Sequence, residues 1–216
     1  WDDVIKVEVS GYGASANAVI NGQADASMGS SVSSIFNKTN ASPRGLFFPP
    51  MPHNEEAGWK RAIAVAPHFA KAVVTNFVGS SDSNKSFEGM NYPYPIFVTM
   101  EKTSEDLSYH LTEAVMENYD QFKDSGPGMD GYQLSNQNFS WIFPYHPGSV
   151  KFYKKKGVWT SKHDKHNANL IERQDVWAKA WQKTLKANLS GDAFKKKWLE
   201  NRASALKAAG MPNAYN

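Results

Sequence analysis

Two histidine patterns are the first candidates for chemistry in this chain of 216 residues. His146-Pro147-Gly148 could present an imidazole at the start of a helix, because proline is common at the first helical position and the preceding residue often caps it. A catalytic base would need a carboxylate or a nucleophile close by, and none lies at a recognisable spacing. His163 and His166 have the spacing of a metal pair, but two flanking lysines repel a cation and no third ligand is evident. We therefore interpret both patterns as structural, a turn and a solvated helix start, and predict no catalytic residue and no metal site.

A glycine–serine loop at residues 29–31 is the strongest candidate for contact with a ligand. It follows a strand predicted around residues 24–28 and precedes a predicted helix, so its backbone N–H groups and serine hydroxyls suit an anion such as a carboxylate or a phosphate. A second loop, at residues 10–12, ends the first predicted strand. Ligands of open α/β sheets bind at the carboxyl ends of the strands, so both loops could line one cleft. The predicted ligand-binding residues are Ser10, Tyr12, Gly29, Ser30 and Ser31.

Two lysine runs and a weakly basic composition limit the classes of partner. Lys154–Lys156 and Lys195–Lys197 lie in predicted helices beside apolar residues. We interpret them as solvated faces, with docking to an acidic partner as the alternative. The formal net charge is +3, with lysine and arginine spread along the chain, which does not favour nucleic-acid binding. The sequence contains no GK[ST], GxSxG or HExxH motif, so nucleotide hydrolysis and the common hydrolase chemistries have no motif in their support, and we expect no cofactor.

Composition indicates a folded protein without cysteine chemistry. A hydrophobic content of 41% over 216 residues is enough to form a substantial core. The absence of cysteine excludes disulfides, thiolate zinc sites and a cysteine nucleophile. No apolar run approaches the roughly 20 residues of a membrane span, and no signal peptide is recognised. Because the chain opens directly in a predicted strand, we expect it to be a mature or truncated portion of a longer protein.

The elements that would position these loops alternate between strand and helix. Residues 4–9 alternate apolar and charged side chains, the pattern of a half-buried strand. A helix follows, with Ser15 as N-cap and Gly22 as a left-handed C-cap. The order strand, helix, strand, helix predicts an α/β unit with parallel strands. Further predicted elements are a helix that carries Val32, Ile35 and Phe36 on one side, strands at residues 46–48 and 92–100, a helix after Asn54 with Trp59 and Ile63 facing inward, and a surface loop at residues 80–85.

The later part of the chain is predicted to be mainly helical. Thr103 or Ser104 caps a long helix, with acidic residues in its first turn. Apolar residues at helical spacing predict the face of this helix that points into the core, and they are Leu107, Leu111, Ala114, Val115, Tyr119 and Phe122. Three more helices are predicted at residues 149–156, 167–188 and 192–209.

Three segments together resemble one family, the TAXI-type solute-binding proteins of TRAP transporters. "SGYGASANAVINGQADASMGSS" is similar to the family's strand, helix ending in Asn-Gly, and strand with Asp-Ala, here Asn21-Gly22 and Asp25-Ala26. "YPYPIFVTMEKTSEDLSYHLTEAVMEN" resembles its strand followed by a helix. "YHPGSVKFYKKKGVW" resembles its His-Pro-Gly-Ala segment, with Ser149 where alanine is usual. The resemblance spans nearly the whole chain in the same order and favours the structural interpretation of His146.

The resemblance implies a fold, a function and a location. It implies an α/β protein with two lobes, of the periplasmic-binding-protein-like type II (Venus-flytrap) class, in which a parallel-rich sheet is followed by C-terminal closing helices. Such a protein closes on a small organic acid or amino acid in the periplasm and delivers it to a TRAP permease driven by an ion gradient. The loops at residues 10–12 and 29–31 match positions that face the cleft between the lobes, and Arg44 is the nearest basic residue.

The family's glycine-rich N-terminal segment is not recognised here, so the chain resembles the later part of such a protein. We therefore expect a second α/β lobe at residues 1–100. Residues 101–216 are then a hinge-crossing strand and helix followed by C-terminal helices that pack on both lobes.

Two other classes of function are compatible with the pattern. The effector-sensing domain of a transcriptional regulator has the same architecture and would be cytoplasmic, with a helix-turn-helix upstream. An enzyme on an α/β scaffold would use His146 or the pair His163 and His166. We favour the binding protein, because a binding protein needs preformed hydrogen-bond donors and no nucleophile.

Overall fold

The computed structural model describes residues 3–92 and 96–214, which form two compact units. The first unit comprises the chain up to Glu55, Lys71–Asn91 and Asp124–Asp130, and the second comprises Glu56–Ala70, Tyr92–Lys123 and the chain from Gly131 onward. The predicted lobe boundary at residue 100 stays a prediction. In the described ranges, no helix combines the length and the apolar character that crossing a membrane requires.

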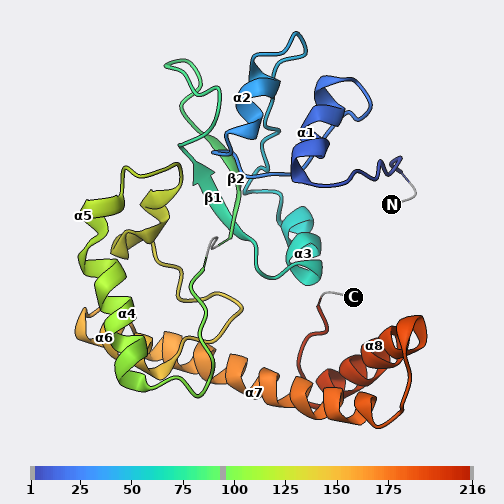
Figure 1. The fold of residues 1–216 in the computed structure, drawn as a ribbon, viewed down its shortest axis with the longest axis vertical. Coiled ribbons are helices and arrows are strands. Elements are labelled where there is room, and N and C mark those ends of the chain that lie inside the picture. Colours follow the sequence, from blue (N-terminus) through green and yellow to red (C-terminus); the bar gives the residue numbers. More distant parts are fainter. Residues whose placement is uncertain (1–2, 93–95, 215–216) are drawn as a thin grey trace. The chain divides into compact units, whose positions relative to one another are not determined.

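The first unit contains two short helices and one two-stranded sheet (Figure 1). Helix α1 spans Tyr12–Ile20 and packs with helix α2, Ile35–Asn40, while strand β1, Ala70–Val74, is hydrogen-bonded to strand β2, Phe87–Asn91. The helix predicted at residues 15–22 is confirmed, and Gly22 after it has the predicted left-handed conformation, with φ of +72°. Ser15 is not its N-cap, because its hydroxyl donates to the carbonyl of Tyr12 at 2.7 Å from within the first turn. The predicted loop at residues 80–85 is confirmed and contains one bridge between Ser81 and Asn84.

The strands predicted at residues 4–9, 24–28 and 46–48 are wrong, and so is the described part of the one at residues 92–100. Residues 93–95 of that last strand lie outside the described residues. Alternation indicates which side chains prefer burial, but a strand also needs a neighbour for its N–H and C=O groups, and none pairs with these segments among the described residues. Val4 and Ile5 are accordingly 59% and 93% exposed. The two described strands leave the predicted parallel-rich sheet unconfirmed.

The core of the first unit is aromatic. Phe36 and Phe77 are 4% and 5% exposed, and the ring of Phe48 packs edge-on against both at 6.0 Å and stacks on Phe87 at 5.6 Å. The neighbouring Phe47 is 77% exposed. Side chains at residues 46–48, predicted as a strand, therefore alternate between partly buried and exposed, although this segment pairs with no other strand among the described residues. These edge-on contacts fix the start of α2 against the sheet, which determines where the residue 29–31 loop lies.

The second unit is helical, as the sequence predicts (Figure 1). Ser104 caps helix α4 by accepting a hydrogen bond from the Leu107 N–H at 3.2 Å. Trp59 of helix α3 is 4% exposed, in agreement with its predicted inward position, whereas Ile63 of the same helix was predicted to face inward and is 41% exposed. The helices are α3 at Glu56–Val65, α4 at Glu105–Glu117, α5 at Tyr119–Phe122, α6 at Pro147–Lys155, α7 at Ser161–Leu185 and α8 at Gly191–Ala208, with short 3-10 turns at Met129–Tyr132 and Leu134–Asn136.

Helix α4 turns a different face toward its neighbour from the one predicted. Leu107 and Leu111, predicted to point inward, are 51% and 55% exposed. The face against α6 carries small hydroxyl residues instead, because the hydroxyl of Ser149 lies 3.1 Å from that of Ser108 and 2.8 Å from that of Thr112. Small side chains let the two helix backbones approach closely, and this contact replaces the expected apolar stripe.

Helix α6 is also held by the aromatic core of the second unit. Phe139, Phe152, Tyr153 and Trp159 form this core, and Phe152 is fully buried. Burial raises the pKa of the adjacent Tyr145 phenol to about 12 and also raises that of Tyr153. Both phenols therefore stay protonated at physiological pH and serve as neutral packing groups.

The lysine run at residues 154–156 is bonded within the protein. Lys154 pairs with Asp164 at 2.9 Å, and Lys156 pairs with Glu117. Lys155 donates to the Tyr109 hydroxyl at 2.8 Å and lies 3.5 Å from Glu113. The three lysines are exposed beside the buried Phe152 and Tyr153, as predicted for a solvated face, and their ion pairs also connect α6 to α4 and α7.

Asp164 also accepts a hydrogen bond from the Trp159 indole at 2.8 Å. The hydrogen bonds from Lys154 and then from Trp159 hold the pKa of this carboxyl below its usual value. A carboxyl with a depressed pKa stabilises the fold above the pKa of the unfolded chain, and this contribution is lost as the pH falls through the folded pKa. We expect Asp164→Asn to lower the urea midpoint more at about pH 7 than at about pH 3. Asp175→Asn on the same helix controls for the lost charge, and an equal effect of Asp164→Asn at both pH values would contradict the prediction.

Candidate functional site

The structure brings three of the five predicted ligand-binding residues into direct contact. Tyr12, in the first turn of α1, accepts a hydrogen bond on its hydroxyl from the backbone N–H of Ser30 at 3.2 Å. Its ring also packs edge-on against Phe36 at 6.3 Å. Gly29 fits under this pair only because it has no side chain, since a Cβ there would meet the Tyr12 hydroxyl and lie 2.6 Å from the Phe36 ring. The two loops predicted to share one site are therefore joined by a tyrosine.

The joined loops present hydrogen-bond donors that have no acceptor in the part of the chain that the structure describes. The Tyr12 hydroxyl accepts from Ser30, so its own proton stays available to a second acceptor. Tyr12 is 47% exposed, and Ser30, whose hydroxyl is a second donor, is also exposed. Ser10 is exposed and precedes Gly11, the N-cap of the nine-residue helix α1, which has no acidic residue in its first turn. Hydroxyl donors beside a helix N-terminus suit an anionic acceptor.

The loop at residues 29–31 does not itself begin a helix, which corrects the prediction. Residues 31–32 form a turn, with the Ser33 N–H donating to the Ser30 carbonyl at 3.0 Å, and α2 starts only at Ile35. The helix terminus closest in sequence to the site is therefore that of α1. Sequence patterning places the strand-to-helix transition too early because the serines favour turns and caps equally.

Ser31 has a structural contact that the sequence could not predict. Its hydroxyl donates to the Asn76 carbonyl at 3.3 Å, and its own carbonyl accepts from the Val78 N–H at 2.9 Å. The loop is thereby tied to the chain just after β1, 45 residues away. No local signal marks such a pairing, so sequence reasoning missed the segment at residues 76–78 as support for the site.

Arg44, the basic residue that sequence analysis placed nearest to the predicted site, forms an ion pair with Asp25 in the first unit. It lies 4.0 Å from Asp25, and both side chains are solvent-exposed. An exposed pair at this distance is weak, so Arg44 retains much of its capacity to bind an anion. No described contact links it to Tyr12 or Ser30, and we do not place it in the site.

The histidines have contacts that account for their positions. His146 is the N-cap of α6 and accepts a hydrogen bond at Nδ1 from the Gly148 N–H at 3.2 Å, as predicted for a turn. His163 accepts from the Thr160 N–H at 3.1 Å in a capping box, and His166 lies 2.6 Å from the Trp141 carbonyl. Both are partly buried rather than solvated. Within residues 3–92 and 96–214, no three His, Asp or Glu side chains gather as a metal site would require.

Comparison with known proteins gives one match. The model of the NMT1-like family matches residues 1–157, well over half of the chain, including both loops of the candidate site and helix α6. No curated protein and no solved structure matches the chain. The chain therefore belongs to the NMT1-like family, a periplasmic-binding-protein-like family related to solute-binding proteins.

Proposed function

We propose that the protein captures a small carboxylate, an organic acid or an amino acid, in the periplasm and delivers it to a TRAP-type permease. The observation that carries this proposal is the hydrogen bond from the Ser30 N–H to the Tyr12 hydroxyl, which joins two loops and leaves the phenol proton available to a second acceptor. A receptor of this kind works by preformed donors and closure around its ligand, without a catalytic residue.

The family and the chemistry of the site support the two parts of the proposal separately. Members of the NMT1-like family are typically extracytoplasmic solute-binding proteins, which supports solute capture in general. The carboxylate is inferred from the donors, namely the Tyr12 and Ser30 hydroxyls beside the start of α1. The TRAP permease is inferred from the three TAXI-like segments, two of which lie wholly within the matched residues.

A thermal-shift screen of the protein against organic acids, amino acids and sulfonates tests the proposal. A ligand at a hundredfold its Kd adds about 2.7 kcal/mol of stability. This raises the melting temperature of a protein of this size by roughly 5–10 °C. A shift restricted to carboxylates is the expected result. A shift with sulfonates alone would reject the carboxylate.

Tyr12→Phe is expected to weaken ligand binding about tenfold. The substitution removes the Tyr12 hydroxyl, and the loss of its hydrogen bond to the ligand costs roughly 1–1.5 kcal/mol of binding free energy. The variant also removes the acceptor of the Ser30 N–H, but water can replace it at this exposed position and the phenylalanine ring keeps the edge contact with Phe36. The melting temperature without ligand should therefore stay within a few degrees of the wild type. Titration calorimetry with the ligand from the screen measures the affinity. Tyr119→Phe on α5 is the matched control, and an equal loss of affinity in both variants would exclude Tyr12 from the site.

A further inference from the structure

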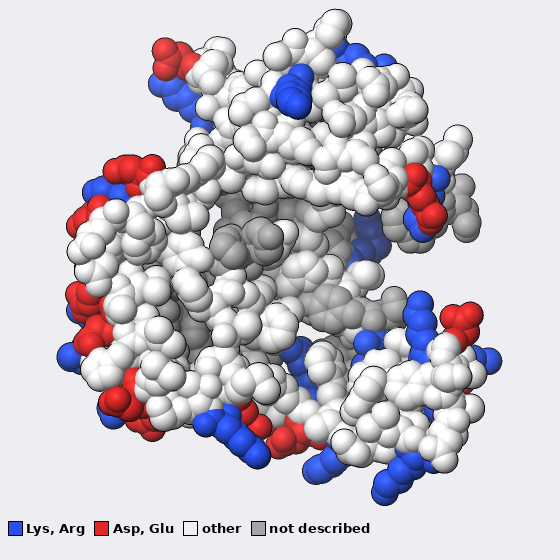
Figure 2. All heavy atoms as spheres, in the orientation of Figure 1, with Lys and Arg blue, Asp and Glu red and all other residues white. Residues whose placement is uncertain are grey.

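The C-terminal helical hairpin differs from the rest of the chain in charge and lies outside the matched family region. The match ends at residue 157, before α7 begins at Ser161. Residues 161–216 contain 11 lysine and arginine and five aspartate and glutamate residues, a formal charge of +6, whereas residues 1–160 contain 13 and 16, a charge of −3. Figure 1 shows α8 folded back beside the C-terminal half of α7, and Figure 2 shows lysine and arginine side chains projecting from this hairpin. The positive charge of the chain is therefore concentrated in a region that the family match does not cover.

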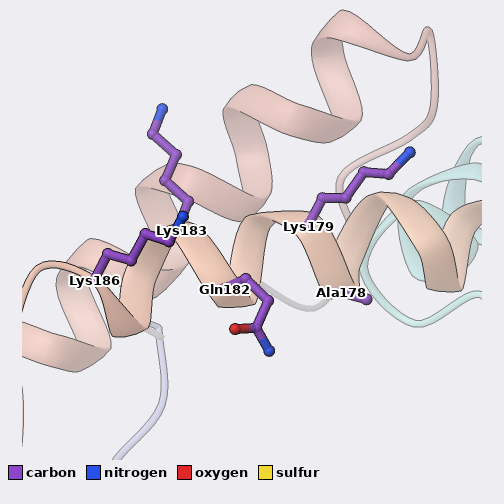
Figure 3. A pocket seen from close by; sticks show the side chains of 5 residues that line it. All are labelled: Ala178, Lys179, Gln182, Lys183 and Lys186. Atoms are coloured by element: carbon purple, nitrogen blue, oxygen red, sulfur yellow. The ribbon is translucent and has the colours of Figure 1, made fainter.

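One face of α7 concentrates this charge at a surface depression. Lys179, Lys183 and Lys186 are exposed and fall on neighbouring turns of one flank of the helix. They line an open depression of about 400 Å³ together with Ala178 and Gln182, with no acidic residue in its wall. Figure 3 shows the side chains of Lys179 and Lys183 extending away from the α7 ribbon, and that of Lys186 running toward Lys183 in this view. Among the described residues, none of the three ammonium groups has an ion pair or side-chain hydrogen bond, in contrast to the paired lysines of α6.

An apolar stripe runs beside these lysines on the solvent side of the same helix. Ile171, Ala178 and Leu185 are seven residues apart in succession, so they lie along one line of α7. Ile171 and Leu185 are 46% and 45% exposed. Lysine flanked by exposed aliphatic residues on one helix is the pattern of an interfacial helix, in which lysines meet headgroups and apolar side chains enter the boundary region.

The exposed basic residues of the hairpin are lysines rather than arginines, which favours an anionic surface without fixed contact geometry as the partner. Both arginines of this region are engaged within the fold: Arg173 donates to the Ile142 carbonyl at 2.7 Å, and Arg202 is buried. The exposed cations of the hairpin are thus lysines. Arginine is suited to fixed bidentate contacts with carboxylates on a protein partner, whereas lysine is a compact, hydrated point charge on a flexible stem.

We propose that the α7–α8 hairpin docks on the surface of a bilayer that contains anionic phospholipid. Lys179, Lys183 and Lys186 contact headgroup phosphates, and Ile171 and Leu185 lie at the boundary between headgroups and acyl chains. This docking is independent of solute binding, since it uses neither Tyr12 nor Ser30. It holds the receptor against the membrane through charge, so that high salt releases it.

Co-sedimentation with vesicles tests the docking. The protein is expected to sediment with phosphatidylcholine vesicles that contain about 30% phosphatidylglycerol, and not with pure phosphatidylcholine, at about 50 mM salt. Lys179→Glu, Lys183→Glu and Lys186→Glu together should reduce the partition coefficient about a hundredfold, because each lysine near an anionic surface contributes roughly a factor of five. The variant should keep the wild-type circular dichroism spectrum and the ligand-induced thermal shift.

A matched variant distinguishes the hairpin from net charge alone. Lys38→Glu, Lys60→Glu and Lys102→Glu together change the formal charge by the same amount at exposed positions outside the hairpin, and this variant should retain binding within a few-fold. An equal loss in both triple variants, equal binding to neutral vesicles, or no binding to anionic vesicles would overturn the proposal. Binding to immobilised polyglutamate without binding to vesicles would also overturn it, in favour of an acidic protein partner.

Discussion

Phe152→Ala is expected to lower the free energy of unfolding by about 3–5 kcal/mol. Phe152 is fully buried in α6 and belongs to the core cluster with Phe139, Tyr153 and Trp159. Its ring packs edge-on against that of Tyr109 at 5.9 Å, so the substitution leaves a cavity between α4 and α6 as well as losing the ring's own burial.

Urea unfolding followed by circular dichroism measures this loss, provided that the slope with denaturant is unchanged. Leu107→Ala on α4 is the informative control, because Leu107 belongs to the predicted inward stripe but is 51% exposed. We expect it to cost less than about 1 kcal/mol. If Leu107→Ala cost as much as Phe152→Ala, the face of α4 that packs on α6 would have been assigned incorrectly.

Gly148→Ala is expected to destabilise the protein by about 3 kcal/mol or more, a severe effect for a single methyl group. A Cβ at this position would meet the carbonyl oxygen of Glu105 and lie 2.7 Å from the backbone nitrogen of Tyr109. Both are backbone atoms of α4, so no side-chain rotation relieves the clash. The helices must separate, and the hydroxyl contacts of Ser149 with Ser108 and Thr112 would break with them.

The melting temperature should fall by roughly 6–12 °C for such a loss in a protein of this size. Gly131→Ala is the matched control, since an added Cβ there meets no atom within 4 Å and the residue has no left-handed backbone conformation. It should melt within about 2 °C of the wild type. A Gly148→Ala protein with an unchanged melting temperature would show that α4 and α6 do not approach this closely.

The helices were predictable because their signals are local. Ser104 caps α4, Gly22 adopts the left-handed conformation after α1, and His146 before a proline caps α6. Each depends on residues within one turn of the element, so the sequence contains all the atoms involved. The predicted start of α7 is six residues too late, because the capping box of Thr160 and His163 uses a histidine where glutamate or glutamine is usual.

The strands were not predictable, for the converse reason. Residues 4–9 have a strand's alternation, yet a strand exists only where a second backbone accepts and donates its hydrogen bonds. Strand β1 was not predicted, and it forms because β2 lies beside it across a long loop. The sequence of one segment alone does not show which distant segment will pair with it.

The sequence by itself determined the absence of regular structure at residues 29–31, the helical second half and the structural roles of His146 and Gly22. It did so because glycine, proline, serine and charge act on their immediate neighbours. Only the tertiary structure decided that the Tyr12 hydroxyl meets the Ser30 N–H, that Ser31 is tied to Asn76, and that α4 packs through Ser108 instead of Leu107. These depend on which backbones can approach each other, and that distance is set by the packing of the whole unit rather than by the period of any one helix.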